Sequence, residues 1–423
     1  MKLNKNINIA IIGLGYVGLP LAILFSKKYK VIGFDIDLSR IDELKENNDR
    51  TNEISSIELK DAIANNLDLT FEIKNIANCN IYIITVPTPI TESKKPDLSF
   101  LEIASEQVGK ILKKKDIVIY ESTVYPGCTE EFCIPVLEKN SSLKVNKDFF
   151  IGYSPERINP GDKINTIDKI VKVTSGSNKE SSVFIDRLYS SVITAGTYQA
   201  SSIKIAEASK AIENAQRDLN ISFVNELAII FNLMKIDTNE VLDAASTKWN
   251  FLKFKPGLVG GHCISVDPYY LMYKSLELGY KPKVLLSGRE VNEKMGKFIA
   301  DDIIDYLKLR NVFSKDIHIL ILGVTYKENS RDLRNTRVPD IYNSLNNQFS
   351  NIDVYDPHAD YDECFNNLNI KIVKDLNQYD LIILAVSHNE FKEIDFSKLK
   401  KNDKSIIYDI KSFLDKDIVD KIL

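Results

Sequence analysis

The chain has little cysteine and only a small excess of negative charge, with a formal net charge of −4. Its 423 residues include five cysteines, an odd number without a Cys-x-x-Cys pair, which argues against a disulfide framework and against a zinc site. Lysine and arginine number 55 against 59 acidic residues, and no basic stripe is interleaved with aromatic side chains. These absences disfavour nucleic acid as a partner, predict no bound metal and favour a reducing, cytoplasmic environment.

The sequence also lacks a segment that predicts secretion or membrane insertion. The stretch from Ile9 to Phe25 is uncharged, but three glycines and Pro20 interrupt it, and no small-x-small cleavage pattern follows. A second strand pattern, from Val31 to Asp35, comes shortly afterwards. We therefore expect neither a leader peptide nor a membrane span.

Alternating strands and helices define two α/β regions. Short Val/Ile runs separated by amphipathic helical stretches predict parallel sheets covered on both faces. The expected strands lie at 7–12, 31–34, 81–86, 117–120 and 149–152 in the first region, and at 317–322, 352–355, 381–386 and 406–410 in the second. With a prior of about 150 residues per domain, the chain accommodates two or three domains.

A single long helix is expected between the two regions. From about Ser202, apolar residues recur at helical spacing for about thirty residues without glycine or proline. Such a helix would join the two halves, and its apolar stripe fits a subunit interface and ordinary packing equally well. The predicted division of the chain is 1–200, 201–305 and 306–423.

The first turn of the chain has the pattern of a dinucleotide site. It reads Gly13-x-Gly15-x-x-Gly18 between an expected strand and helix, and Asp35 ends the next strand. The glycines permit the turn, the approach of a pyrophosphate to backbone N–H groups and close packing of the helix. Asp35 would hydrogen-bond a ribose diol and repel a 2′-phosphate, so NAD is favoured over NADP. The predicted fold class is α/β, with two doubly wound Rossmann-like domains joined by a long central helix.

The equivalent turn of the second region is of a different kind. It has one glycine, Gly323, followed by several cations that include Lys327 and Arg334. A lysine offers a point charge and an arginine a planar fork to the oxygens of a diphosphate. A loop of solvated charges is the alternative interpretation.

The middle of the chain carries two further polar features. Lys210 and Asn214 lie one helical turn apart and could both donate to an oxyanion, although a solvated polar stripe has the same spacing. The glycine-rich segment 257–268 presents Cys263, followed by Asp267. A thiolate is a nucleophile, and a buried structural cysteine is the alternative. An NAD site together with a nucleophilic thiol indicates oxidation of an alcohol to an acid.

Together these motifs resemble the UDP-glucose/GDP-mannose dehydrogenase family, the nucleotide-sugar 6-dehydrogenases. The resemblance covers almost the whole chain and rests on Gly13 to Gly18, Pro87-Thr88-Pro89, Glu121-Ser122-Thr123, Ser154-Pro155-Glu156-Arg157, Lys210 with Asn214, Gly260-Gly261-His262-Cys263 with Asp267, and Lys327 with Arg334. It implies an NAD-binding domain at 1–200, a central helical dimerisation region at 201–305 and a UDP-sugar-binding domain at 306–423. The implied partners are a UDP-sugar and a second copy of the chain.

The resemblance also implies a four-electron oxidation of a sugar C6 alcohol to a carboxylate. A first hydride passes to NAD, Cys263 attacks the aldehyde, a second NAD removes hydride from the thiohemiacetal, and water hydrolyses the thioester. Lys210 and Asn214 would stabilise oxyanions. The remaining implied catalytic residues are Asp267 and Thr123, which would position water and relay protons, and Glu156, as a general base or in thioester hydrolysis.

The implied binding residues fall into two sets. Those for the cofactor NAD are Gly13, Gly15, Tyr16, Val17, Gly18, Asp35, Arg40, Pro87, Thr88 and Thr123. Those for the substrate are Glu156, Arg157, Ile158, Lys210, Asn214, Arg217, Phe254, Lys255, Gly257, Gly260, Tyr326, Lys327 and Arg334.

Two departures from the UDP-glucose branch bear on the substrate. Members of that branch usually carry a second glutamate four residues after the one at 156, and a Lys-Asp pair after the cysteine loop, whereas this chain has Pro160 and Val266-Asp267. Segments 156–161 and 260–270 resemble the branch that oxidises UDP-N-acetylhexosamines. Within that branch, segment 248–258 is most similar to enzymes that oxidise UDP-N-acetylglucosamine or UDP-N-acetylgalactosamine rather than the mannosamine epimer. Their products feed surface polysaccharides such as O-antigen and capsule.

Other functions stay open at this stage. The alternative substrates are UDP-N-acetylmannosamine and UDP-glucose. A two-electron hydroxyacid dehydrogenase would need no nucleophilic thiol, and an NAD-binding assembly protein would need no chemistry at all.

Overall fold

The computed structural model describes residues 7–159, 162, 164–261 and 264–423, which fall into two compact units. Unit 1 is the described part of Met1–Glu213 with Tyr269–Tyr280, and unit 2 is the described part of Asn214–Pro268 with Lys281–Leu423. The three-part division expected from the sequence stays a prediction.

Within the described residues, unit 1 contains an eight-stranded sheet in the order β3-β2-β1-β4-β5-β6-β7-β8. Its strands are β1 (Asn8–Ile12), β2 (Lys30–Phe34), β3 (Leu67–Thr70), β4 (Ile81–Ile84), β5 (Ile117–Tyr120), β6 (Phe150–Tyr153), β7 (Lys172–Gly176) and β8 (Thr197–Gln199). All neighbouring strands are parallel except β6 and β7, which are antiparallel. The strand order reverses at β1 and β4, and ligands of open α/β sheets bind at such a switch point.

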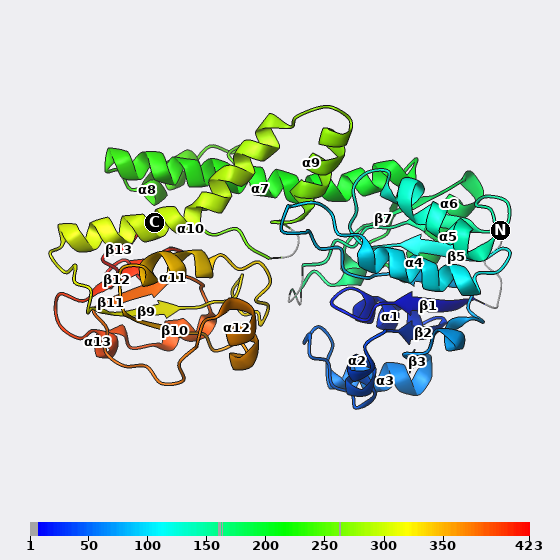
Figure 1. Ribbon diagram of the computed structural model, residues 1–423, viewed down its shortest axis with the longest axis horizontal. Helices are drawn as coiled ribbons and strands as arrows, with labels where there is room; N and C mark the ends of the chain where they lie inside the picture. The colour runs from blue at the N-terminus through cyan, green and yellow to red at the C-terminus, as the bar shows by residue number, and fades with distance from the viewer. Residues whose placement is uncertain (1–6, 160–161, 163, 262–263) are drawn as a thin grey trace. The chain divides into compact units, whose positions relative to one another are not determined.

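Helices cover this sheet, as Figure 1 shows. They are α1 (Gly18–Ser26), which is apolar and almost wholly buried, α2 (Leu38–Lys45), α3 (Ser56–Asn65), α4 (Ser99–Ile111), α5 (Ile134–Ser141) and α6 (Lys179–Ser190), with the short turns η1 (Ile73–Ile76), η2 (Thr129–Cys133) and η3 (Ile167–Lys169). Most of α9 (Asp267–Glu277) also belongs to unit 1. The start of α3 is fixed by a capping box, in which Ser55 and Glu58 each accept from the other's backbone N–H. Buried Ile, Leu and Phe side chains of β1, β4 and α1, with Val31 of β2, form much of the core.

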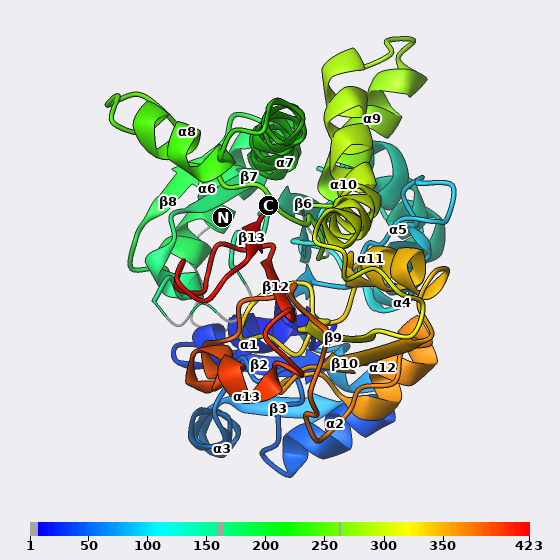
Figure 2. The same cartoon turned by 90° about the vertical axis from the view of Figure 1, so that its left-hand side faces the viewer.

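Unit 2 contains a fully parallel sheet in the order β10-β9-β11-β12-β13. Its strands are β9 (His318–Leu322), β10 (Asn351–Tyr355), β11 (Leu381–Leu384), β12 (Ile406–Asp409) and β13 (Lys421–Ile422). Its helices are α8 (Thr238–Ala245), α10 (Lys283–Leu309), α11 (Val338–Asn346), α12 (Tyr361–Leu368), α13 (Phe396–Leu399) and the short η4 (Asn389–Glu393). Helices α10 and α11 lie side by side (Figure 2) and share the core with β9 and β11.

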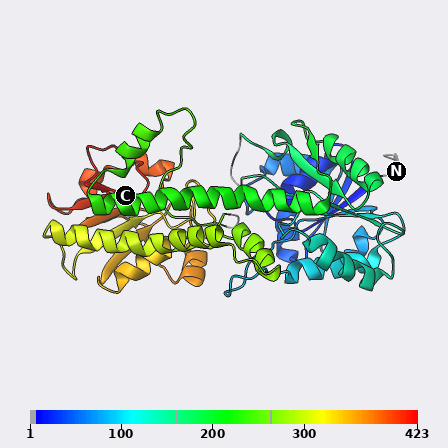
Figure 3. The same cartoon turned by 90° about the horizontal axis from the view of Figure 1, so that it is seen from above.

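The predicted long helix is α7 (Ile203–Met234), 32 residues that begin in unit 1 and continue into unit 2. In unit 2 it runs beside α10 (Figure 3), to which it is tied by the hydrogen bond from Asn232 Nδ2 to Asp302 Oδ1, 2.9 Å. The predicted fold class, two Rossmann-like sheets with a long central helix, is confirmed. The second long helix, α10, was not singled out from the sequence. None of the helices in the described ranges has both the length and the apolar character needed to cross a bilayer.

Candidate active site

The predicted dinucleotide turn joins β1 to α1 in unit 1. The N–H of Gly13 donates to the carbonyl of Phe34, and Gly13 has a φ of +93°, which a side chain would strain. A Cβ on Gly18 would lie 1.8 Å from the carbonyl oxygen of Gly13, so only glycine fits there. A Cβ on Gly15 would meet no atom within 4 Å. The turn therefore has a tightly packed base and an open outer edge, a shape that suits a pyrophosphate.

Asp35 and Arg40 both support this turn. Asp35 Oδ2 accepts from the N–H of Leu14 at 2.8 Å, which holds the carboxylate beside the turn. The Arg40 guanidinium is buried and donates to the carbonyl of Leu14, to Glu43 and to Asp49. The predicted contact of Arg40 with NAD stays a prediction. Its observed contacts link the glycine turn to Glu43 and Asp49 and so stabilise the turn.

Two loops at the carboxyl ends of β4 and β5 are joined to each other. The Thr88 hydroxyl donates to the carbonyl of Thr123 at 2.7 Å, and Ser122 Oγ donates to the carbonyl of Val86 at 2.7 Å. Tyr270 of α9 closes the group by donating to the carbonyl of Thr88 at 2.9 Å. Because β1, β4 and β5 are parallel, these loops and the glycine turn lie at the same edge of the sheet.

Glu207 of α7 anchors the chain that follows Thr123. Its carboxylate accepts from the N–H groups of Gly127 at 2.5 Å and Thr129 at 2.9 Å. Burial raises the pKa of Glu207 from 4.5 to about 7, against the lowering effect of the hydrogen bonds from Thr129 and Gly127. The anchor is therefore a carboxyl group that changes charge near neutral pH.

The Glu207 anchor predicts a pH-dependent stability. Because its folded-state pKa lies above 4.5, ionisation on raising the pH through about 7 disfavours the folded state. Ionisation of Glu207 would lower the free energy of unfolding by on the order of 3 kcal/mol at most. We expect Glu207→Gln to reduce the fall in the free energy of unfolding between pH 5 and pH 8, measured with urea. Glu102→Gln, on an exposed position of α4, is the control, and equal falls in the wild type and Glu207→Gln would contradict the prediction.

In unit 2, the structure brings together two of the predicted catalytic residues. Asn214 Nδ2 donates to Asp267 Oδ2 at 2.6 Å, and both side chains are buried. Lys210, one turn earlier on α7 and assigned to unit 1, is also buried. A buried amide held by a carboxylate is a preorganised polar group of the kind that stabilises developing charge.

The segment that carries the predicted nucleophile is held at its beginning by α7. The side chain of Asn225 makes two hydrogen bonds to the backbone of Gly257: Oδ1 accepts from its N–H at 2.8 Å, and Nδ2 donates to its carbonyl at 3.1 Å. Asn225 Nδ2 also donates to Oδ1 of Asn292 in α10 at 2.8 Å. Further along, Ser265 Oγ donates to the carbonyl of Gly261. His262 and Cys263 lie outside the described residues.

The two glycines before this cysteine pack against the turn after β9. A Cβ on Gly260 would lie 2.7 Å from the carbonyl oxygen of Asn335, and one on Gly261 would lie 2.7 Å from the ring of Tyr326. The predicted substrate residues Gly260 and Tyr326 therefore belong to one neighbourhood of unit 2. Close packing leaves positions 260 and 261 to glycine alone.

A pocket opens at the switch point of the unit 2 sheet, where β9 and β11 end. Its lining includes Tyr326 and Lys327, as predicted for the substrate, and two cations that sequence reasoning missed, Arg337 and Lys411. Lys411 follows the carboxyl end of β12, so the edge rule for parallel sheets could have indicated it. Arg334 is bound instead to Asp332, with an Nη2 to Oδ2 distance of 2.6 Å, and is not part of this lining.

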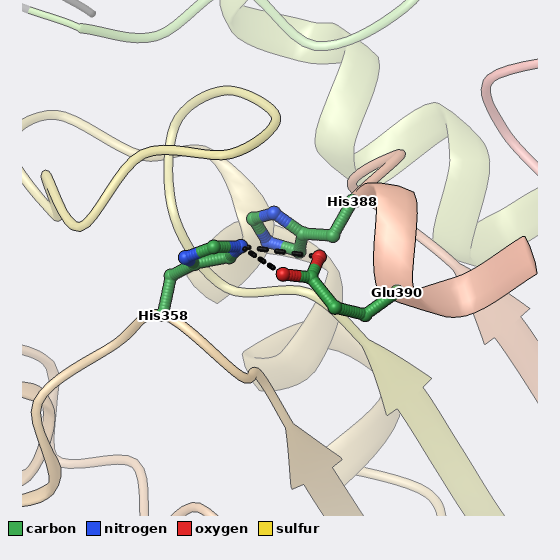
Figure 4. A group of neighbouring side chains, drawn as sticks. All are labelled: His358, His388 and Glu390. Carbon is green, nitrogen blue, oxygen red and sulfur yellow. Dashed lines mark hydrogen bonds and ion pairs between the residues drawn. The ribbon is translucent and has the colours of Figure 1, made fainter. Parts of the chain in front are cut away.

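Figure 4 shows a neighbouring group, His358, His388 and Glu390, whose ligand atoms lie within 4.8 Å of one another. The buried His388 ring is already hydrogen-bonded at both nitrogens. Nδ1 accepts from the N–H of Asn329 at 2.9 Å, and Nε2 donates to Asp356 Oδ2 at 3.0 Å. Neither nitrogen has a lone pair left for a metal. Since Asp356 also accepts from the N–H groups of Val324 and Thr325, the group fixes the turn that presents Lys327.

The remaining predicted residues have varied surroundings. Arg157 lies in unit 1, with Nη2 at 2.8 Å from Glu213 Oε1. Arg217 and Lys255 are exposed, Tyr16, Val17, Ile158 and Phe254 are half-buried, and Pro87 is exposed. The binding and catalytic roles of all these residues stay predictions.

Comparisons with known proteins agree with the geometry. Three domain models of the UDP-glucose/GDP-mannose dehydrogenase family match the chain: the NAD binding domain at residues 7–193, the central domain at 204–294 and the UDP binding domain at 320–416. A UDP-N-acetyl-D-glucosamine 6-dehydrogenase of Pseudomonas aeruginosa is 52% identical over 417 residues, 98% of each chain. Protein CapL of Staphylococcus aureus is 52% identical over 416 residues, 97% of each chain.

Solved structures support the same assignment. A UDP-D-ManNAc dehydrogenase from Pyrococcus horikoshii has a TM-score of 0.87 at 28% identity, over 97% of this chain and 96% of that chain. The resemblance expected from the motifs is confirmed. The chain therefore belongs to the UDP-glucose/GDP-mannose dehydrogenase family and is an NAD-dependent nucleotide-sugar dehydrogenase.

Proposed function

We propose that the enzyme oxidises the C6 hydroxyl of UDP-N-acetylglucosamine, UDP-N-acetylgalactosamine or both to the uronate. The observation that carries the proposed chemistry is the buried hydrogen bond between Asn214 and Asp267, at the end of the cysteine segment. The 52% identity to a UDP-N-acetyl-D-glucosamine 6-dehydrogenase supports the substrate, whereas a UDP-N-acetyl-D-mannosamine dehydrogenase of Methanocaldococcus jannaschii is 31% identical.

The residues of unit 1 fit NAD, which when bound would supply a hydride acceptor for C6 in each of the two oxidations. The open edge at Gly15 leaves room for the pyrophosphate, and Asp35 lies beside the turn, where it can accept from ribose hydroxyls. Thr88 and Thr123, which are joined to each other, would line the same edge of the sheet.

The chain's own groups would then process the aldehyde. The Cys263 thiolate adds to the aldehyde carbon, and Lys210 and Asn214 donate to the resulting oxyanion. After the second oxidation, water cleaves the thioester, which releases the uronate and restores the thiol. Asp267, oriented by Asn214, would take up the proton of that water. Lys327 and Lys411 would supply positive charge for the diphosphate of the UDP-sugar, and Arg337, which is also ion-paired with Asp340 at 3.3 Å and with Glu293 at 3.7 Å, lies in the same lining.

A substrate panel tests the proposal. Purified enzyme is incubated with NAD and UDP-glucose, UDP-N-acetylglucosamine, UDP-N-acetylgalactosamine or UDP-N-acetylmannosamine, and NADH formation is followed with mass spectrometry of the sugar product. We expect kcat/KM to be highest for one of the two predicted N-acetylhexosamines, with two NADH formed per sugar. One NADH per sugar with a released aldehyde would reject the four-electron mechanism, and a preference for UDP-glucose or UDP-N-acetylmannosamine would reject the substrate assignment.

The exposed face of α7 supports a homodimer. Ile205, Ile212, Phe223 and Ile230 are 49%, 55%, 55% and 42% exposed. They are spaced by seven, eleven and seven residues, close to whole helical turns, so they share one face. An exposed apolar stripe on one helix face, here interrupted at Gln216, is typical of a subunit interface.

The dimer proposal predicts the effect of a charge on this face. We expect Phe223→Asp to shift the mass in light scattering from that of a dimer to that of the 48.0 kDa monomer, because a carboxylate would be desolvated at the interface. Ile57→Asp, at a position on α3 that is 82% exposed, is the matched control and should leave the mass unchanged. A monomeric wild type, or a dimeric Phe223→Asp, would contradict the proposed interface.

The same proposal covers the setting of the enzyme. We place it in the cytoplasm, where UDP-sugars and NAD are available, with its product entering a surface polysaccharide such as O-antigen or capsule. Protein CapL, 52% identical, supports the capsule assignment by its name. The division into an NAD-binding domain, a central helical dimerisation region and a UDP-sugar-binding domain is part of this proposal.

A further inference from the structure

A buried polar network lies between the two long helices of unit 2. Arg289 of α10 donates from Nη1 to Oδ1 of Asp218 on α7 at 2.6 Å. Asn292, almost one turn further along α10, donates from Nδ2 to the same oxygen at 2.8 Å and to the carbonyl of Asp218 at 3.0 Å. All three residues are at most 2% exposed, so the network is shielded from water.

A close approach of the two helices explains this burial. A Cβ on Gly288 of α10 would lie 2.5 Å from Cδ2 of Leu219 and 2.9 Å from Oγ of Ser222, both on α7. Glycine at position 288 therefore permits the contact that buries the neighbouring Arg289 against Asp218. Burial raises the pKa of Asp218, and the charge of Arg289 acts against that rise. Each charge thus depends on the other, because a buried charge without its partner is strongly destabilising.

The hydrogen bonds of the network have a fixed direction. Paired with Arg289, the Asp218 carboxylate can only accept hydrogen bonds. Nδ2 of Asn292 must therefore face Asp218, which leaves Oδ1 of Asn292 to accept from Nδ2 of Asn225 at 2.8 Å. The amide of Asn225 is oriented in turn, so that its Oδ1 faces the N–H of Gly257 and accepts from it at 2.8 Å. The charge at Asp218 thus determines which way two buried amides point.

The residue held at the end of this network lies beside the unit 2 pocket. A Cβ on Gly257 would lie 3.8 Å from Nζ of Lys411, which is part of the pocket lining. Leu258 and Gly260, which follow in the chain, line the same pocket. Because Asn225 binds both the N–H and the carbonyl of Gly257, it fixes the direction in which the chain enters the pocket wall.

We propose that Asn292 is a positioning residue, which passes the polarity of the Asp218–Arg289 pair to Asn225 and so holds the pocket wall that begins at Gly257 ready for the UDP-sugar. The inference rests on the proposed function, because that function assigns the diphosphate of the UDP-sugar to this pocket. A wall that is already ordered spares the ligand the entropy of ordering it, so losing the network should weaken binding.

The test measures the binding of UDP and of NAD separately, by calorimetry, to the wild type and to Asn292→Asp. This variant keeps the shape of the side chain but replaces the donor that faces Asp218 with an acceptor. We expect the Kd of UDP to rise about tenfold, because the amide of Asn225 loses its orientation. The Kd of NAD should stay within about twofold, since the glycine turn and Asp35 belong to unit 1.

A charge exchange provides the rescue. Asp218→Asn combined with Asn292→Asp keeps the net charge, places a donor at 218 opposite an acceptor at 292, and leaves an oxygen at 292 for Nδ2 of Asn225. The Kd of UDP for this double variant should return to within about threefold of the wild type. Such a rescue depends on the direction of the hydrogen bonds and would not follow if Asn292 only filled space between the helices.

Asn343→Asp, at an exposed position of α11, is the matched control and should leave the Kd of UDP unchanged. Should Asn292→Asp fail to fold, Asn225→Leu replaces it, because leucine removes both hydrogen bonds to Gly257 and adds no charge; the same tenfold rise is expected. An unchanged Kd of UDP in either folded variant, or a double variant that binds no tighter than Asn292→Asp, would overturn the proposal. A wild type that does not bind UDP would reject the proposed function, and this inference with it.

Discussion

Cys263→Ala is expected to lower uronate formation by at least about 10³-fold, because it removes the thiol to which we assign the covalent intermediate that links the two oxidations. Loss of the nucleophile should leave NAD affinity unchanged, since the glycine turn and Asp35 belong to unit 1. The measurements are NADH formation, product mass and NAD binding by calorimetry. A single oxidation that stops at the aldehyde is compatible with this expectation, whereas full uronate formation by the variant is not.

Other cysteines offer a control because their surroundings suppress the thiolate. Burial raises the pKa of the Cys79 thiol to about 12 and that of Cys364 to about 11. Such thiols stay protonated and unreactive at neutral pH. Cys364→Ala, in the core of unit 2, should therefore retain turnover and differ from the wild type only by a modest loss of stability.

Gly18→Ala is expected to reduce the free energy of unfolding by about 3 kcal/mol and to abolish NAD binding. The added methyl group would lie 1.8 Å from the carbonyl oxygen of Gly13 and 2.5 Å from Thr85 Oγ1, so the turn between β1 and α1 must shift. Chemical denaturation measures the first effect and calorimetry with NAD the second.

Gly15→Ala separates the two consequences. A Cβ at this position meets no atom within 4 Å, and Gly15 has no positive φ, so the unliganded protein should unfold at the same denaturant concentration as the wild type. The methyl group would occupy the edge we assign to the pyrophosphate, so NAD binding should still weaken. A Gly15→Ala variant with unchanged NAD affinity would place the pyrophosphate elsewhere.

The fold could be predicted from the sequence largely because its signals are local. Strands such as Ile81–Ile84 are continuous apolar runs, and α7 has uninterrupted helical periodicity over 32 residues. The direction of β7 could not be predicted from the sequence. Its antiparallel orientation arises from pairing with β6, and the hydrophobic pattern of a strand does not depend on that orientation. The sequence of α10 is also helical in pattern. It was not identified as a second long helix because attention went to α7, which carries the candidate catalytic residues Lys210 and Asn214.

Parts of the candidate site were out of reach for a related reason. Lys172 of unit 1 forms a buried ion pair with Glu121, 2.7 Å between Nζ and Oε2. The sequence did not indicate this pair, because a lysine at the start of a strand looks like an ordinary solvated end and its partner is 51 residues away. Asn225 could have been found, because it lies eleven residues after Asn214 on a mostly apolar helix and thus on the same face. For Arg40 the sequence identified a residue near the dinucleotide turn but not the direction of its side chain. The guanidinium donates to the carbonyl of Leu14 in that turn.

Asn214 and Asn225 of α7 fix the distance between the two ends of the cysteine segment. Asn225 holds Gly257, where the segment begins, and Asn214 holds Asp267, where it ends. Three helical turns separate the two amides, so the distance between the segment's ends is set at about 16 Å by the rise of the helix rather than by the segment itself. Inserting one residue between the two would turn one amide away from the segment by about 100°. The number of residues between Asn214 and Asn225 must therefore stay at its present value, even where exposed side chains of α7 can be substituted.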